Sequence, residues 1–240
     1  MTGRLAVVVG GTSGIGLATA CVLIEAGWQV LATGATQAEV ERARAESYGP
    51  RLVFERLDVV DEQAVARFFG GLDTLGFLFC AAGVGSSASE FTEAGFRRTV
   101  EVNLMGTMRC CYAARPLLAE GGGAIVTVAS MMSFFGTAKG PAYAASKGAV
   151  VQLTRSLAIA WAADGIRVNA VAPGWIDTPM SRPLQADEDY NRRVLARSPM
   201  RRWGRPEEIG QVVAFLASTK ASFVNGSVIP VDGGYLAVGV

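Results

Sequence analysis

Apolar positions fall into two kinds of segment along the chain. Some segments are long and repeat apolar residues at helical spacing, as Ile15, Ala18, Val22 and Ala26 do. Others are short, continuous apolar runs, at 5–11, 29–33, 52–59, 75–83, 123–130, 166–174 and 226–234. Apolar strands that alternate with helices are typical of a parallel sheet covered on both faces. The pattern predicts an α/β fold with a doubly wound, seven-stranded parallel sheet and helices on both faces.

A single domain, residues 1–240, accounts for this alternation, because no repeat, linker or low-complexity tract interrupts it. The least regular segment is 178–199, TPMSRPLQADEDYNRRVLARSP, whose prolines and mixed charges follow a predicted strand. Loops in this position often cover a ligand. We therefore predict that 178–199 forms a mobile lid over a substrate.

Composition narrows the classes of protein that fit. Hydrophobic residues make up 50% of the chain and charged residues 18%. The longest mainly apolar run, 75–85, is far shorter than the ~20 residues that cross a bilayer. The first residues, MTGRLAVVVGG, carry no targeting pattern, so we predict a cytoplasmic protein without a membrane partner. A net charge of +1 with intermixed signs predicts no nucleic-acid partner.

Cysteine and histidine usage excludes several kinds of site. The four cysteines show no paired spacing, and the chain has no histidine. We therefore expect reduced, mostly buried thiols and no metal site. The absence of histidine also excludes catalysis by Ser-His-Asp or Cys-His groups.

A glycine-rich loop, VGGTSGIG, follows the first predicted strand and opens a predicted helix. Its glycines allow a tight turn, a close approach of backbone to a pyrophosphate, and close packing of helix on sheet. The helix N-terminus points its N–H groups and its positive dipole end at the phosphates. We predict a dinucleotide site with loop contacts from Gly10, Thr12, Ser13, Gly14, Ile15 and Gly16.

The end of the second predicted strand distinguishes between the two nicotinamide cofactors. An acidic side chain there would bind the adenosine ribose and repel a 2′-phosphate. The sequence is instead ATGATQ, in which Gly34 and Ala35 are neutral and Thr36 is polar. This favours NADP(H). NAD(H) remains the alternative, because no arginine or lysine lies there or in the glycine loop and Arg42 is the nearest base.

Asp58, at the end of the third predicted strand, has two interpretations. Its carboxylate can bind the adenine amino group of the cofactor, with Val59 beside it. It can equally cap the helix predicted for the following segment, EQAVARFF.

Tyr143 and Lys147 are four residues apart in a predicted helix, so they share one face roughly 6 Å apart. A nearby ammonium favours phenolate, and we expect the tyrosine pKa to fall about two to three pH units below its usual value near 10. Such a tyrosine exchanges a proton near neutral pH, although the pair alone is also common on helix surfaces. Ser130 ends a predicted strand thirteen residues earlier, where open α/β sheets place ligands. Its hydroxyl can hold a carbonyl oxygen beside the tyrosine.

These motifs resemble the short-chain dehydrogenase/reductase family, classical type, over essentially the whole length. The shared motifs are the Gly10/Gly14/Gly16 loop, Asp58, CAAG at 80–83, VNLMG at 102–106, Ser130, YAASK at 143–147, NAVAPGWIDT at 169–178 and VDGGY at 231–235. The pattern is nearest to 3-oxoacyl carrier-protein reductases, which share RWGRPEEI and VDGGY. The resemblance implies a Rossmann fold and an oxidoreductase that moves a hydride between a nicotinamide cofactor and a carbonyl or secondary alcohol.

The resemblance also implies roles for individual residues. Tyr143 is implied to be the general acid or base, Ser130 to orient the carbonyl, and Lys147 to lower the tyrosine pKa and bind the nicotinamide ribose. Asn103 is implied to hold a water in a proton relay, and a hydrogen-bonded buried amide is its alternative. The cofactor contacts implied outside the glycine loop are Thr36, Asp58, Val59, Ala82, Gly83, Tyr143, Lys147, Pro173, Gly174, Ile176 and Thr178.

Two departures from the family pattern lie beside the glycine loop. Val9 replaces the usual threonine, and CAAG replaces the usual NNAG. Cys80 and Ala81 lack the side-chain hydrogen bonds that asparagines make. We expect these changes to affect local rigidity more than chemistry.

Less specific features of the sequence bear on alternative functions, on the substrate and on the assembly. A nucleotide-binding regulatory or scaffold protein would have the same fold with little turnover. An epimerase or dehydratase of the extended branch of the family is disfavoured, because the chain is short and lacks a C-terminal substrate domain. Apolar residues near the predicted site, among them Phe135 and Trp175, belong either to the core or to the cleft; if they line the cleft, they favour a mostly apolar or neutral carbonyl substrate. The helices near 104–119 and 143–162 carry apolar faces, and members of the family that the chain resembles pair such helices across a two-fold axis, so the resemblance implies a homotetramer, with a dimer second.

Overall fold

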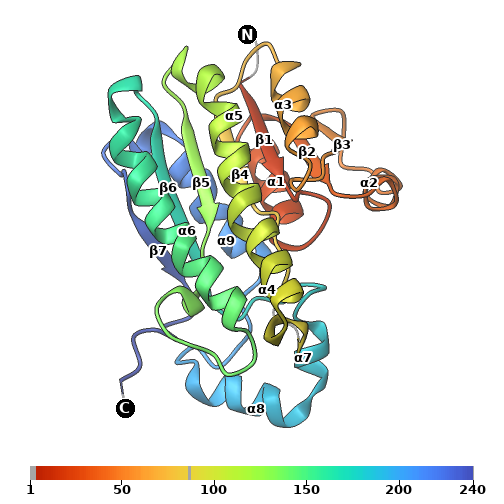
Figure 1. Cartoon of the computed structure of the whole chain (residues 1–240), viewed down its shortest axis with the longest axis vertical. Helices are drawn as coiled ribbons and strands as arrows, with labels where there is room; N and C mark the ends of the chain where they lie inside the picture. Colours follow the sequence, from red (N-terminus) through yellow and green to blue (C-terminus); the bar gives the residue numbers. More distant parts are fainter. Residues whose placement is uncertain (1–3, 86–87, 240) are drawn as a thin grey trace.

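The sheet of this computed structural model has seven parallel strands in the order β3-β2-β1-β4-β5-β6-β7 (Figure 1). The structure describes residues 4–85 and 88–239, so positions 1–3, 86–87 and 240 of the predicted domain lie outside the described residues. The strands are β1 (Leu5–Val9), β2 (Gln29–Gly34), β3 (Leu52–Arg56), β4 (Phe77–Cys80), β5 (Ala124–Val128), β6 (Arg167–Pro173) and β7 (Val228–Val231). The strand order reverses between β1 and β4, where doubly wound sheets bind ligands. The predicted fold class is confirmed.

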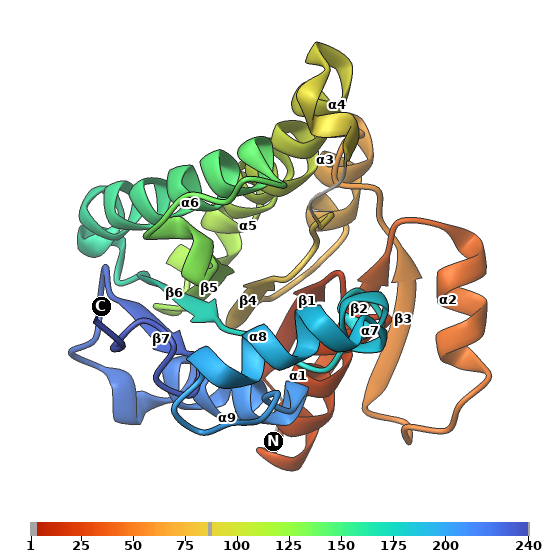
Figure 2. The same ribbon diagram turned by 90° about the horizontal axis from the view of Figure 1, so that it is seen from below.

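Helices cover both faces of the sheet (Figure 2). One layer contains α1 (Gly14–Glu25), α2 (Gln37–Arg44) and α9 (Pro206–Ala217), and the other contains α3 (Glu62–Gly70), α5 (Thr107–Ala119) and α6 (Pro141–Ala160). α4 (Glu93–Val100) continues into α5 through a π-helical turn, η2 (Glu101–Gly106). The remaining helical elements are η1 (Ala88–Phe91), η3 (Met131–Ser133), η4 (Ala162–Asp164), α7 (Arg182–Ala186), α8 (Glu188–Arg197) and η5 (Thr219–Ala221).

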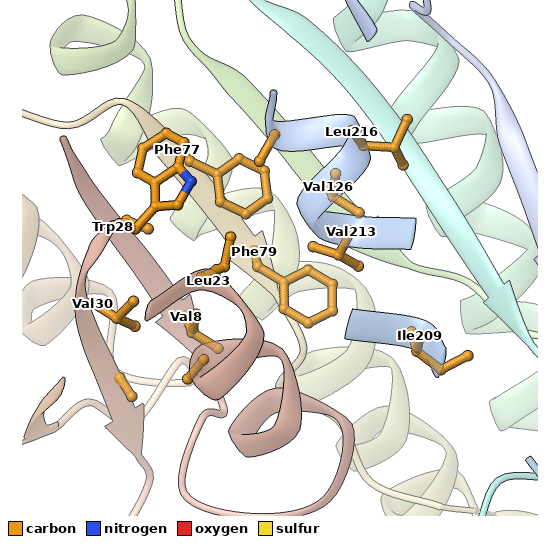
Figure 3. Close-up of a cluster of buried hydrophobic side chains, with 14 of the residues drawn as sticks. Val8, Leu23, Trp28, Val30, Phe77, Phe79, Val126, Ile209, Val213 and Leu216 are labelled. Carbon is orange, nitrogen blue, oxygen red and sulfur yellow. The ribbon is translucent and has the colours of Figure 1, made fainter. Parts of the chain in front are cut away.

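Alternate residues of each strand contribute to two separate cores. In β1, Val8 faces α1 and α9, whereas Val7 faces α3 and α5. Figure 3 shows the first core, where Phe79 of β4 lies among Leu23 and Val213 from the two helices. Because both faces of the sheet are buried, its polar chemistry is confined to the ends of the strands.

The predicted lid, 178–199, is helical in the structure. It contains α7 and α8, which lie below the carboxyl ends of the strands in Figure 1. Asp187 caps α8 by accepting a hydrogen bond from the Tyr190 N–H at 3.0 Å. The sequence obscured these helices because α8 buries only Val194, which leaves no apolar stripe to recognise. That the segment moves as a lid stays a prediction.

The cysteines are free thiols, as expected. Cys80, Cys110 and Cys111 are buried, and the sulfur atoms of Cys80 and Cys111 lie 3.9 Å apart, whereas Cys21 is half-buried. Cys80 therefore packs against another thiol where the family pattern has an asparagine. Within residues 4–85 and 88–239, no helix combines the length and the apolar character needed to cross a bilayer.

Candidate active site

The loop between β1 and α1 is shaped by contacts that only glycine permits. Gly10 has a φ of +79°, and a Cβ there would lie 2.6 Å from Ala82 Cα. A Cβ on Gly16 would lie 2.1 Å from the carbonyl oxygen of Gly10. α1 begins at Gly14 with no acidic residue in its first turn and no side-chain cap from Ser13, so its first N–H groups can bind an anion. This cradle of bare backbone at a helix N-terminus fits the pyrophosphate of a dinucleotide.

The segment that follows β6 returns to the glycine loop. A Cβ on Gly14 would lie 3.5 Å from Thr178 Cβ, although the two residues are far apart in the sequence. Ser181 fixes this segment: its Oγ donates to the carbonyl oxygen of Ile176 at 2.6 Å and accepts from the Thr178 N–H at 3.0 Å. The contacts predicted at Pro173, Gly174, Ile176 and Thr178 therefore belong to one segment that reaches the glycine loop.

Ser130 and Tyr143 meet at the carboxyl end of β5. Ser130 Oγ accepts a hydrogen bond from the Met132 N–H at 3.1 Å, and its hydroxyl lies near enough to the Tyr143 side chain, in the first turn of α6, to lower the pKa of that tyrosine. One turn further along α6, Lys147 Nζ donates to the carbonyl oxygen of Val128 at 2.8 Å. Nζ lies 5.8 Å from the centroid of the Tyr143 ring. The three side chains that the sequence connected are thus neighbours.

Asn103 lies in the π-helical turn η2 and is fully buried. Its Oδ1 accepts from the Val84 N–H at 2.8 Å, and its Nδ2 donates to the Val84 carbonyl oxygen at 3.1 Å and to Ser146 Oγ at 3.2 Å. A Cβ on Gly83 would lie 3.2 Å from Asn103 Oδ1 and 3.6 Å from Lys147 Nζ. The side chain is therefore a hydrogen-bonded buried amide that ties the loop after β4 to α6. A water held by this residue stays a prediction.

The electrostatics of Tyr143 differ from the expectation. Burial raises the pKa of Tyr143, the hydrogen bond with Ser130 lowers it in part, and the carboxylate of Glu90 raises it further. Burial also lowers the pKa of Lys147 to about 8. The prediction that Lys147 brings the tyrosine pKa down to near neutral is therefore wrong for this structure. Helical spacing gave the proximity of the two groups, but not the cost of burying a charge.

Glu90 is a site residue that the sequence did not reveal. Its side chain is 2% exposed, and its Oε2 accepts a hydrogen bond from the Tyr143 N–H at 3.0 Å. Gly140, the residue at the N-cap of α6, has no side chain to fill this role, so a residue from η1 caps the helix that carries the tyrosine. Thr99 Oγ1 contacts the other carboxylate oxygen at 3.4 Å. No local motif could have found this contact, because the partners are 53 residues apart.

Charged groups of both signs lie at the end of β2, where the sequence indicated none. Thr36 caps α2 in a capping box with Glu39, and Glu39 Oε2 accepts from the Ala35 N–H at 2.8 Å. Arg56 pairs in register with Gly34 across β2 and β3, and its Nε donates to the Ala35 carbonyl oxygen at 3.3 Å. The expectation that Arg42 is the nearest base is therefore wrong. Helix capping and strand register bring these two charges to the strand end from positions outside it.

Asp58 is not the helix cap. Its Oδ1 accepts a hydrogen bond from the Val60 N–H at 3.0 Å, whereas Asp61 caps α3 by accepting from the Ala64 N–H at 2.9 Å. The capping interpretation of Asp58 is wrong because the chain makes a turn at 58–61 before the helix begins. Contact of Asp58 with an adenine, and of the buried Val59 with the cofactor, stay predictions.

Aromatic rings gather beyond the carboxyl ends of β5, β6 and β7. Trp175 lies 5.5 Å from Tyr190, 5.5 Å from Trp203 and 6.4 Å from Tyr235, measured between ring centroids, and Tyr235 lies 6.2 Å from Phe135. We call these five residues the α8 aromatic cluster, since Tyr190 belongs to α8. Two of them, Phe135 and Trp175, were predicted near the site, and the other three were not.

Comparison with known proteins finds similarity over nearly the whole chain. Residues 9–236 match the family described as enoyl-(acyl carrier protein) reductase. The chain is 43% identical to cis-4-hydroxycyclohexanecarboxylate dehydrogenase of Sinomonas cyclohexanicum, over 98% of this chain and 97% of that one. It is 37% identical to 2-dehydro-3-deoxy-D-gluconate 5-dehydrogenase of Bacillus subtilis, over 99% and 96%. A crystal structure from Agrobacterium tumefaciens with bound NADP superposes with a TM-score of 0.87 at 34% identity, over 98% and 97%.

Proposed function

The chain belongs to the short-chain dehydrogenase/reductase family, and we propose that Tyr143 is the general acid and base of its hydride transfer between a nicotinamide cofactor and a carbonyl or secondary alcohol. The observation that carries the proposal is the meeting of Ser130, Tyr143 and Lys147 at the carboxyl end of β5. The relatives named above are dehydrogenases that match this chain from end to end. The chain is accordingly an oxidoreductase that acts on CH–OH and C=O groups.

Each residue of the site has a role in the proposed reaction. The bound cofactor supplies or accepts the hydride. Ser130 holds the carbonyl oxygen, and Tyr143 donates a proton to that oxygen as the carbonyl is reduced. Because burial raises the tyrosine pKa, the hydroxyl stays protonated at neutral pH and can act as an acid. In the direction of alcohol oxidation the same oxygen accepts the proton, which requires a higher pH. In the proposal, Lys147 holds the cofactor ribose and Asn103 holds a relay water.

For the cofactor we propose NADP(H). Arg56 lies at the end of β2 and offers a guanidinium to a 2′-phosphate, and a structural relative binds NADP. Glu39 acts in the opposite sense, because its carboxylate would repel that phosphate. Calorimetric titration with NADPH and NADH tests this balance. We expect Arg56→Ala to weaken NADPH binding by about tenfold with little effect on NADH, and Glu39→Gln to strengthen NADPH binding. Equal effects on the two cofactors would contradict the proposal.

For the assembly we propose a homotetramer. Apolar side chains are exposed on two separate faces: Tyr112 and Ile159 on α5 and α6, and Phe215 and Phe223 on and beyond α9. Two self-complementary interfaces are what a tetramer with perpendicular two-fold axes needs. Sedimentation at micromolar concentration should show a tetramer, and Phe223→Asp should reduce it to dimers. A monomer alone would contradict the proposal.

Residues 1–240 work in this proposal as one catalytic domain, with 178–199 as its substrate lid. The position of α7 and α8 beneath the strand ends supports the lid (Figure 1). We place the protein in the cytoplasm, a compartment in which free thiols such as those of Cys80 and Cys111 stay reduced.

A panel of ketones and alcohols, followed by the absorbance of the reduced cofactor with NADP(H) and NAD(H), tests the function. Tyr143→Phe should abolish turnover and leave cofactor affinity nearly unchanged. Tyr48→Phe is the matched control, since Tyr48 is hydrogen-bonded to Glu46 away from the site. Equal activity of Tyr143→Phe and wild type would defeat the mechanism. Cofactor binding without turnover of any compound by the wild type would favour the regulatory or scaffold alternative.

A further inference from the structure

Arg197, the last residue of α8, lies against two neighbouring rings of the α8 aromatic cluster. Its guanidinium carbon lies 4.4 Å from the centroid of the Tyr235 ring and 5.2 Å from that of Phe135. Guanidinium groups stack on ring faces through cation–π attraction, which leaves the N–H donors at their edge available. The two aromatic contacts thus fix the direction of the cation without occupying its hydrogen-bonding groups.

Within the described part of the chain, two neighbouring arginines form ion pairs, whereas Arg197 and Arg193, also on α8, do not. Arg192 pairs with Asp189 at 2.7 Å, and Arg202 pairs with Glu208 at 2.6 Å. Among residues 4–85 and 88–239, no carboxylate forms an ion pair with Arg197. A cation that is packed against aromatic rings, but left without an anion, is suited to receive one from a ligand.

A second donor lies in the same cluster. Trp175 Nε1 is buried and, within the part of the chain that the structure describes, has no hydrogen-bond partner. A buried N–H of this kind ordinarily finds an acceptor. Trp203, its neighbour, does so, because its Nε1 donates to Asn191 Oδ1 at 2.8 Å. The cluster therefore offers an unused indole N–H as well as an unpaired guanidinium.

The cluster is connected to the reacting groups through short segments of chain. Phe135 lies five residues after Ser130, and Trp175 lies two residues after the end of β6, in the segment that reaches the glycine loop. Tyr235 follows β7, the neighbour of β6 in the sheet. A compound whose reacting carbon lies at Ser130 and Tyr143 therefore extends from the same sheet edge that carries the rings and the cation.

We propose that Arg197 binds the carboxylate of the substrate, while the α8 aromatic cluster packs against its apolar body. The substrate class is then an apolar hydroxy acid, or the corresponding keto acid, whose secondary alcohol or ketone reacts at Tyr143. This inference rests on the proposed function and adds a negative charge to the apolar substrate expected from the sequence. A carboxylate matches the planar fork of donors on arginine, and Arg197 is exposed, so its donors can be reached by a ligand.

The experiment compares two probes that differ only in charge, 4-hydroxycyclohexanecarboxylate and its methyl ester. The value of kcat/KM is measured for both with the wild type, Arg197→Met and Arg193→Met. Arg193 is the matched control, because it lies on α8 with its guanidinium carbon 5.7 Å from the Tyr190 ring centroid. For Arg197→Met, we expect the ratio of acid to ester to fall about 30-fold, the equivalent of about 2 kcal/mol. Arg197→Lys should recover part of the ratio, and Arg193→Met should keep it.

Several outcomes would overturn the inference. Arg197→Met could lower kcat/KM for both probes by the same factor, which would make Arg197 a purely structural contact. Arg193→Met could instead change the acid-to-ester ratio of kcat/KM. The wild type could also have a higher kcat/KM for the ester than for the acid. If other compounds of the panel react but neither probe does, this inference fails and the proposed function stands.

Binding without turnover separates the two proposals. In the Tyr143→Phe background with NADP⁺ present, the acid should raise the melting temperature. It should not do so once Arg197→Met is added. This outcome would uphold the carboxylate site even if the catalytic proposal failed, and equal melting shifts in the two variants would reject it. A melting curve without ligand first checks that each variant is folded. If Arg197→Met is not folded, Arg197→Lys replaces it in this comparison.

Discussion

The proposed catalytic residues and the α8 aromatic cluster lie at the same edge of the sheet but are held in different ways. Lys147 and Asn103 are tied to the backbone of other elements by hydrogen bonds of 2.8 to 3.1 Å, and both side chains are buried. The aromatic cluster is instead held by ring contacts of 5.5 to 6.4 Å and by cations over rings. Among the residues that the structure describes, the one hydrogen bond between side chains in this cluster joins Trp203 to Asn191.

This difference separates the reaction from recognition. Hydrogen bonds to fixed backbone atoms define one position for Lys147 and for Asn103 beside Tyr143, and the proposed reaction needs such fixed positions. Ring contacts tolerate small shifts, so a recognition surface built from them can change while the chemistry is kept. The expected consequence is that substitutions in the first region lower kcat steeply, whereas those in the second mainly change KM. Four predictions test this comparison.

The largest effect is expected for Lys147→Met. It removes the buried ammonium beside Tyr143 together with its hydrogen bond to Val128. We expect kcat to fall about a thousandfold, or about 4 kcal/mol in the barrier. Steady-state assays with Lys220→Met as the exposed-lysine control measure it. A loss below tenfold would mean that the lysine does not act on the reaction.

The same residue predicts how stability depends on pH. Burial lowers the Lys147 pKa from 10.5 to about 8, so between these values the unfolded chain binds more protons than the folded one. The contribution of Lys147 to the free energy of unfolding therefore rises with pH between these two values, by up to about 3 kcal/mol. Urea unfolding of wild type and Lys147→Met between pH 7 and pH 10.5 measures the difference. A difference that stays constant with pH would contradict the lowered pKa.

A smaller effect is expected at Glu90, a positioning residue. Glu90→Ala removes the cap of α6 at Tyr143, and we expect kcat to fall about tenfold, as for the loss of a helix cap. Glu90→Gln keeps an acceptor there but removes the charge that raises the Tyr143 pKa. It should restore most of kcat and move the pH profile toward lower pH.

The contrast between the two Glu90 variants makes the test specific. If Glu90→Gln and Glu90→Ala have the same kcat, or if Glu90→Gln leaves the pH profile where it is, Glu90 is a structural residue only. Glu93→Ala is the control, because Glu93 is exposed and pairs with Arg97 on the surface of α4.

The smallest effect is expected in the aromatic cluster. Trp203→Phe keeps a ring against Trp175 but removes the hydrogen bond to Asn191 at 2.8 Å. We expect KM to rise about threefold, within the range of one neutral hydrogen bond, and kcat to stay nearly constant. A larger loss in kcat than in KM would break the distinction between the two regions.

Much of the fold could be predicted, because the signals that define it are local. Continuous apolar strands, glycine at positions such as Gly10 and helical spacing in α1 each reflect short-range sterics or burial of a repeated face. The helices in 178–199 escaped prediction, since α8 lies at the surface and buries a single valine. Ser130, Tyr143 and Lys147 could be connected because two of them share a helix turn and the third ends a strand.

By itself, the sequence determined the class of fold, the glycine cradle and the groups that we propose to exchange a proton. Only the tertiary structure decided their environment. Glu90 caps α6 from a distant segment, Arg56 reaches β2 through strand register, and Arg197 lies against two rings without an ion pair among the described residues. Burial and long-range contacts set pKa values and charge balance, and neither is encoded in the spacing of neighbouring residues.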